Sequence, residues 1–266
     1  AWELITYPSA VGPLSAYATK VKTDGKRRPG VLFVEGGFGG PSTGVFTPQG
    51  SHNDQSATAF EQAGMVVMAP SFRGEAGNPG LIESFYGETE DLLAALQTLR
   101  DRPDVDPDLV YMVGHSTGGT QVLNAAVATD TYRAAFVFGG RAEMSGLYGA
   151  GEYGPEPFDP TNKTEIQFRS AIHWAHHLKR PLYYFEGENA YLTDAVTMAA
   201  RSPKMQAFAV PNADHFTVLQ PVKQLIVQQI VEDTAVEPKF TFSEASLYTA
   251  MKDAAGRQKA DAAADP

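Results

Sequence analysis

Short runs of consecutive apolar residues recur along the chain, separated by polar, glycine-rich or proline-rich connections. Runs of this length without polar alternation are typical of strands that are buried on both faces, as in a parallel sheet. They lie at 30–34, 65–69, 110–115, 134–138, 182–185 and 204–210. Two earlier segments, 2–7 and 14–19, are joined by a proline-flanked loop and predict an antiparallel edge. The pattern therefore predicts one mostly parallel sheet of about eight strands.

Segments with helical character lie between most of these runs. In 88–100, leucines recur three and four residues apart, which predicts an amphipathic helix packed on the sheet. Further helices are expected over 54–63, 163–178 and 216–232. Strands that alternate with helices in this way predict an α/β fold with helices on both faces of the sheet. The final segment, 233–266, is expected to be partly helical, around 243–252, and disordered beyond it, where Ala, Asp and Lys predominate.

One strand and the helix after it are joined by an unusual turn. The apolar run 110–113 leads into Gly114-His115-Ser116-Thr117-Gly118-Gly119, and an alanine-rich helical segment follows at once. Glycines on both sides of Ser116 allow strand and helix to pack more closely than a side chain would permit. A strand, sharp turn and helix in this order are the nucleophile elbow, which makes Ser116 the candidate nucleophile. His115 is expected to point away from the site and to serve in packing.

Through this elbow, residues 1–232 resemble the α/β-hydrolase superfamily, most of all its dienelactone-hydrolase and prolyl-oligopeptidase branches. The resemblance implies a single catalytic domain over 1–232, followed by the tail 233–266. Within the domain, 146–180 is a candidate small lid or pocket wall, because glycines, prolines and aromatic residues are dense in its first half. The resemblance also implies a catalytic triad in the chain order serine, acid, histidine.

His215 lies where the superfamily has its catalytic histidine, between the last strand and the last helix of the domain. The acid is less obvious. Relatives usually read His-Gly-x-x-Asp after the strand 182–185, whereas this chain has Glu186-Gly187-Glu188-Asn189-Ala190 and so lacks the aspartate. Asp194, at the start of the next helix, is the first candidate. Glu188 and Glu143 are the alternatives, and the absence of any acid stays open.

The loop after the strand 30–34 reads Glu35-Gly36-Gly37-Phe38-Gly39-Gly40. A glycine-rich loop can bind phosphate, but this one lacks the Gly-Lys-Ser/Thr of a nucleotide site. In the superfamily the loop supplies one oxyanion-hole amide, here that of Gly37 or Phe38, and the amide of Thr117 supplies the other. Glu35 stands where relatives usually have histidine. That change leaves the backbone donors in place but alters the wall beside them.

Composition and charge limit which partners and cofactors are expected for this protein. The net charge of −10 disfavours nucleic acid, no apolar run is long enough to span a membrane, and a chain without cysteine has no thiolate chemistry. His173 and His177 have metal-ligand spacing, but no third ligand accompanies them, so neither a metal nor another cofactor is expected. A chain that starts at Ala1 without a signal-like segment fits a soluble protein, cytoplasmic or exported after signal removal. It fixes neither the compartment nor the oligomeric state.

These features predict a carboxylesterase-like serine hydrolase that cleaves a small-molecule ester through an acyl-enzyme. The first alternative is a prolyl-oligopeptidase-like peptidase acting on short peptides. The absence of a propeller or another large module from this sequence weighs against it. The second alternative is a weakly active or inactive protein that uses the fold for binding. Ala190 motivates this alternative, because loss of the triad acid costs several orders of magnitude in rate. The sequence identifies neither the acyl group nor the alcohol.

Overall fold

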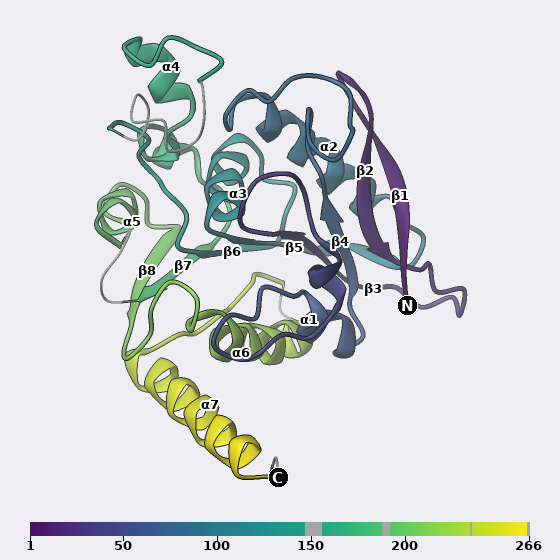
Figure 1. Cartoon of the computed structure of the whole chain (residues 1–266), viewed down its shortest axis with the longest axis vertical. Helices are drawn as coiled ribbons and strands as arrows, with labels where there is room; N and C mark the ends of the chain where they lie inside the picture. Colours follow the sequence, from purple (N-terminus) through teal and green to yellow (C-terminus); the bar gives the residue numbers. More distant parts are fainter. Residues whose placement is uncertain (147–155, 188–191, 235, 265–266) are drawn as a thin grey trace.

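The computed structural model describes residues 1–146, 156–187, 192–234 and 236–264. Within these residues a single eight-stranded sheet runs through the molecule (Figure 1). In pairing order its strands are β1 (Trp2–Ser9), β2 (Gly12–Thr19), β4 (Val66–Pro70), β3 (Arg28–Val34), β5 (Val105–His115), β6 (Ala134–Phe138), β7 (Leu182–Gly187) and β8 (Met205–Val210). The β1–β2 and β2–β4 pairs are antiparallel, and all the others are parallel. The predicted mostly parallel sheet with an antiparallel edge is confirmed.

Helices cover both faces of this sheet (Figure 1). One face packs against α2 (Gly87–Arg100), α3 (Thr117–Ala128), α5 (Leu192–Ala199) and the 3-10 helix η2 (Ala171–His177). The other packs against α1 (Thr58–Gln62), α6 (Leu219–Glu232) and the first turns of α7 (Glu244–Ala264). Along β3, Leu32 and Val34 join the first core, whereas Val31 and Phe33 join the second. Burial on both faces explains why this run is apolar at every position.

Two helices between residues 54 and 178 differ from the sequence-based expectation. The helix expected over 54–63 is reduced to the five residues of α1, because the backbone oxygens of Asp54 and Ser56 accept hydrogen bonds from Lys223 Nζ instead of from helical amides. The helix expected over 163–178 is divided into α4 (Lys163–Phe168) and η2. At the break, Asn124 Nδ2 donates to the carbonyl of Arg169. In both places a contact with a distant helix competes with local helix formation. The remaining short helix, η1 (Thr43–Phe46), follows the glycine-rich loop.

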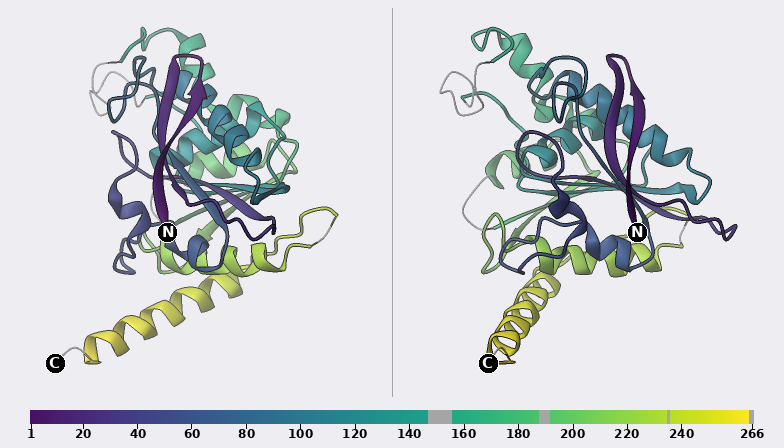
Figure 2. Two further views of the ribbon diagram at one scale, coloured as in Figure 1. Left: turned by 90° about the vertical axis from the view of Figure 1, so that its right-hand side faces the viewer. Right: turned by 45° about the vertical axis from the view of Figure 1, so that its right-hand side comes forward.

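Several residues of the segment after residue 232 belong to the second core. Phe240 and Phe242 are buried, and their rings pack edge-on against Phe136 beneath the sheet. Leu247 and Ala254 of α7 are also buried, and Met251 packs against the same core. The C-terminal end of this helix projects away from the body (Figure 2). The structure places a helix where one was expected, around 243–252. It continues that helix to Ala264, where disorder was expected.

Of the expected lid or pocket wall over 146–180, residues 147–155 lie outside the described residues. In the described part, Phe158 and Ile166 pack against Phe85 and Met144 in a small separate cluster. Phe85 in turn lies 6.4 Å, ring centre to ring centre, from Phe38 of the glycine-rich loop. Phe85 therefore lies between the residues around Phe158 and the loop that follows β3.

The parallel strands β3, β5, β6, β7 and β8 end at one edge of the sheet. In open α/β sheets this carboxyl edge is where sites form. The glycine-rich loop, Ser116, Gly139, Glu186 and His215 lie at or just after the ends of these strands. Segments far apart in the sequence thus meet at the same place.

Candidate active site

The backbone of Ser116 is strained, as a nucleophile elbow requires. Its φ of 54° and ψ of −118° lie in a region that residues with side chains rarely adopt. The turn is held because Ser116 N donates to the carbonyl of Phe138 at 2.8 Å. A Cβ added at Gly114 would overlap the carbonyl oxygen of Gly118, and one added at Gly118 would overlap that of Val34. The glycines at 114 and 118 therefore allow the close packing that the sequence predicted.

His215 is held by a carboxylate at the end of β7. Its Nδ1 lies 2.8 Å from Oε2 of Glu186. The Glu186 side chain is fully buried, that of His215 is 17% exposed, and Gly187 N donates to the other carboxylate oxygen, Oε1, at 2.7 Å. A carboxylate that accepts from Nδ1–H fixes the imidazole in the tautomer whose Nε2 is unprotonated. This is the form of histidine that can accept a proton from a hydroxyl group.

Gly139 brings the serine and the histidine to the same strand end. A Cβ at Gly139 would overlap both Oε2 of Glu186 and Nδ1 of His215, so the carboxylate and the imidazole lie directly against its backbone. The preceding residue, Phe138, accepts the hydrogen bond from Ser116 N. Ser116, His215 and Glu186 thus surround the carboxyl end of β6.

The structure does not bring Asp194, the first candidate for the acid, to the histidine. The Asp194 carboxylate forms an ion pair with Arg141 at 3.1 Å, and burial raises its pKa against the effect of that arginine. Glu143 pairs with His173 at 3.0 Å. Glu188 lies outside the described residues. The acid in contact with His215 is Glu186, which sequence reasoning passed over because it occupies the position of the usual histidine and reads as part of the strand.

The two segments expected to form the oxyanion hole are joined by a hydrogen bond. Thr117 Oγ1 donates to the carbonyl of Gly37 at 2.6 Å, and this links the start of α3 to the glycine-rich loop. Gly37 has a φ of +95°, a value that suits glycine. Buried Glu75 accepts from Gly39 N at 3.2 Å, and Glu35 accepts from Ser42 N at 2.7 Å. The carboxylate that replaces the usual histidine thus holds the loop in place.

His115 is buried, as expected, but it also contacts the histidine loop. The rings of His115 and His215 lie 4.7 Å apart, centre to centre. Nε2 of His115 is 3.2 Å from the backbone oxygen of His215, and Nδ1 is 3.2 Å from the Gln55 side chain. Burial lowers the pKa of His115 to about 3, so its ring is neutral over the working range of most enzymes. Neither hydrogen bond could be predicted from the sequence, because the partners lie 60 and 100 residues from His115 in the chain.

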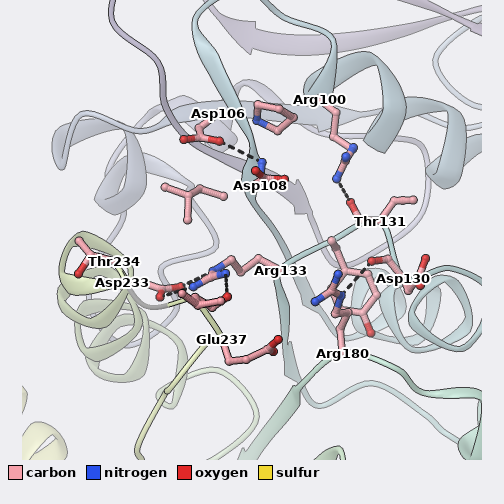
Figure 3. Close-up of a pocket in the computed structure, with 14 residues that line it drawn as sticks. Arg100, Asp106, Asp108, Asp130, Thr131, Arg133, Arg180, Asp233, Thr234 and Glu237 are labelled. Carbon is pink, nitrogen blue, oxygen red and sulfur yellow. Dashed lines mark hydrogen bonds and ion pairs between the residues drawn. The ribbon is translucent and has the colours of Figure 1, made fainter.

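A cavity of about 730 Å³ lies at the opposite edge of the sheet, around the start of β6 (Figure 3). The guanidinium group of Arg133 makes two 2.7 Å contacts with Asp233, and Nε of Arg180 donates to the backbone oxygen of Asp130. The Arg133–Asp233 pair ties the segment after α6 to the sheet, and we assign these groups a structural role. The cavity is separate from the site around Ser116.

Two searches of the described residues bear on cofactors and membranes. No group of three His, Cys, Asp or Glu side chains in this part of the chain is arranged to hold a metal ion. No helix in the same residues combines the length and the hydropathy of a membrane span.

Residues 51–190, just over half of the chain, match the prolyl oligopeptidase family. The chain belongs to the prolyl oligopeptidase family. A curated relative, the uncharacterized peptidase YtmA of Bacillus subtilis, is 33% identical over 117 residues, which make up 43% of this chain and 42% of the relative. The matched range includes Ser116 and the turn around it.

Solved structures share the fold at lower identity. An acylaminoacyl peptidase of Pyrococcus horikoshii is 15% identical with a TM-score of 0.69, and the match covers 93% of this chain and 44% of that one. A hyperthermophilic esterase of the archaeon Pyrobaculum calidifontis is 18% identical with a TM-score of 0.64, covering 87% of this chain and 85% of the esterase. These likenesses confirm the α/β-hydrolase fold. The chain spans less than half the length of YtmA and of the acylaminoacyl peptidase.

Proposed function

We propose that this member of the prolyl oligopeptidase family is a serine hydrolase that cleaves carboxylic esters through an acyl-enzyme. Ser116 is the nucleophile, His215 the general base and Glu186 the acid that orients the base. One observation carries the proposal: the 2.8 Å contact between the buried Glu186 carboxylate and His215 Nδ1, beside the strained turn at Ser116.

The reaction follows from these positions. His215 Nε2 takes the hydroxyl proton of Ser116 as the oxygen attacks the carbonyl carbon of the ester. The amides of Thr117 and of Gly37 or Phe38 stabilise the oxyanion that forms, a contribution of about 10²- to 10³-fold for each such donor. His215 then protonates the departing alcohol. A water molecule, activated by the same histidine, releases the acid from Ser116.

The position of Glu186 favours an active enzyme over the alternative of an inactive binding protein. That alternative rested on Ala190, which stands where relatives have the triad aspartate. A carboxylate that accepts from both Gly187 N and His215 Nδ1 can stabilise the imidazolium formed during the reaction. The function of the missing aspartate is thereby supplied from the end of β7.

An ester is the first candidate for the substrate, and a short peptide is the second. An alcohol is a better leaving group than an amine, so ester cleavage demands less of the acid–base pair. Esterases such as the one from Pyrobaculum calidifontis occur among the proteins with this fold. Family membership and the name of the Bacillus relative favour a peptide. Both substrates would use the same three residues.

Hydrolysis of p-nitrophenyl butyrate and of a short peptide p-nitroanilide tests the proposal. We expect the ester to be cleaved with the larger kcat/KM, and Ser116→Ala to lose at least about 10³-fold in kcat. Ser243→Ala, which changes an exposed serine before α7, serves as the control and should match the wild type. Ester hydrolysis that survives Ser116→Ala would remove the serine from the mechanism. Faster cleavage of the anilide would favour the peptidase.

A further inference from the structure

Lys223, near the start of α6, carries a buried ammonium group. Its side chain is 1% exposed, and Nζ donates to the backbone oxygens of Asp54 and Ser56 at 2.6 Å each and to the Asp54 carboxylate at 3.2 Å. A buried cation is tolerated when its donors are all used in this way. The two backbone acceptors flank Gln55. Lys223 therefore fixes the backbone on both sides of Gln55.

Gln55 contacts the histidine that precedes the nucleophile. Its side-chain Oε1 lies 3.2 Å from Nδ1 of His115, and Nε2 of His115 lies 3.2 Å from the backbone oxygen of His215. A neutral imidazole has one N–H, and a carbonyl oxygen can only accept, so we assign the proton to Nε2. Nδ1 is then an acceptor. With the side-chain amide of Gln55 flipped, so that its nitrogen and oxygen exchange places, its NH₂ group donates to Nδ1 of His115.

The catalytic histidine is thus held from two sides. Glu186 contacts Nδ1 of its ring, whereas His115 contacts its backbone oxygen and lies against its ring at a tilt of 40°. The ring of Phe216 lies edge-on to both imidazoles, at 5.7 Å from His115 and 5.0 Å from His215. His215 lies in a turn between β8 and α6, outside any helix or strand. The Asp214 carboxylate holds this turn by accepting from the amides of Phe216 and Thr217 at 2.9 and 2.8 Å, and His115 adds a contact from the elbow.

We propose that His115 is a positioning residue of this hydrolase: it holds the backbone of His215 so that the imidazole stays within reach of Ser116, and Lys223 anchors it through Gln55. The inference rests on the proposed function, because it requires His215 to be the base. His115 itself exchanges no proton during the reaction. A displacement of about 1 Å in a reacting group costs up to about 10²-fold in rate, which makes such support important.

Three variants test the role of His115. We expect His115→Phe, which keeps a ring but has no N–H donor, to lower kcat for p-nitrophenyl butyrate by about 10- to 100-fold with KM changed less than about 3-fold. His115→Gln can donate from its amide to the same carbonyl and should recover to within about 5-fold of the wild type. Gln55→Leu should lose about 3- to 10-fold. His52→Phe, an exposed histidine in the same segment, is the control and should change nothing.

The rate of Ser116 labelling by a fluorophosphonate separates the two levels of the proposal. A wild-type protein that is not labelled at Ser116 contradicts the proposed function. If the wild type is labelled and His115→Phe and Gln55→Leu react at the wild-type rate, the positioning role alone is wrong. It is also wrong if His115→Gln is as slow as His115→Phe while both unfold at the wild-type temperature. If His115→Phe does not fold, the labelling rate of Gln55→Leu, which changes a half-buried side chain, is compared with the wild type instead. An unchanged rate contradicts the positioning role.

Discussion

Glu186 is the residue at which the proposed triad differs from the one expected from the sequence. It stands in a strand that is otherwise apolar from Leu182 to Phe185, and its carboxylate is fully buried. A buried carboxylate is costly unless it is hydrogen-bonded or paired, and groups of this kind cluster at functional sites. A charged residue directly after the apolar run 182–185 was therefore the signal available in the sequence. It was obscured because Glu186 stands where relatives usually have a histidine, and because Ala190 stands where they have the aspartate.

Substitution of the two acids distinguishes the structural assignment from the sequence-based one. We expect Glu186→Gln to lower kcat by about 10²- to 10⁴-fold with little change in KM, because an uncharged amide cannot stabilise the imidazolium of His215. Asp194→Asn breaks only the partly exposed ion pair with Arg141 and should stay within about 3-fold of the wild type. Steady-state kinetics on p-nitrophenyl butyrate measures both. A larger loss from Asp194→Asn than from Glu186→Gln would restore Asp194 as the acid.

At the scale of elements, the sequence pattern predicted the structure wherever an element is determined by residues close together in the chain. The unit of β5, Ser116 and α3 was predicted because an apolar run, closely spaced glycines and an alanine-rich segment follow one another directly. The segment around Asp54 could not be predicted in this way. Its backbone is held by Lys223, 169 residues further along the chain. A contact at that separation leaves no trace in helix propensity or periodicity.

The contact between α6 and the segment around Gln55 predicts a specific dependence of stability on pH. Burial lowers the pKa of Lys223 to about 8 from its ordinary value of 10.5, so between these values the unfolded chain binds more protons than the folded one. The free energy of unfolding should therefore rise with pH across this window, by up to about 3 kcal/mol from this group. Lys223→Met removes that contribution.

Urea unfolding of the wild type and Lys223→Met at pH 7.5 and pH 10 measures the effect. The difference in unfolding free energy, wild type minus variant, should become more positive at the higher pH. Lys239→Met, which removes an exposed ammonium group, should leave the pH dependence unchanged. A difference for Lys223→Met that is constant with pH would mean that the folded-state pKa of this lysine is unshifted.

At the scale of the whole molecule, the parallel sheet determines which parts of the site the sequence could predict. Parallel strands deliver their following loops to one edge, so Ser116, His215 and the glycine-rich loop could be placed together from strand order alone. The acid could not, because the choice among nearby carboxylates depends on how far each side chain reaches. The packing of Phe240 and Phe242 under the sheet was missed for a similar reason: the segment is short and has no periodicity.

The rate at which a fluorophosphonate labels Ser116 tests most directly whether this hydroxyl is activated by His215 and Glu186. We predict that the wild type is modified at Ser116, as identified by mass spectrometry of its peptides, and that Ser116→Ala is not modified. His215→Asn and Glu186→Gln should each react at least about 10²-fold more slowly than the wild type. Wild-type protein that stays unlabelled at Ser116, or Glu186→Gln labelled at the wild-type rate, would contradict the proposed triad.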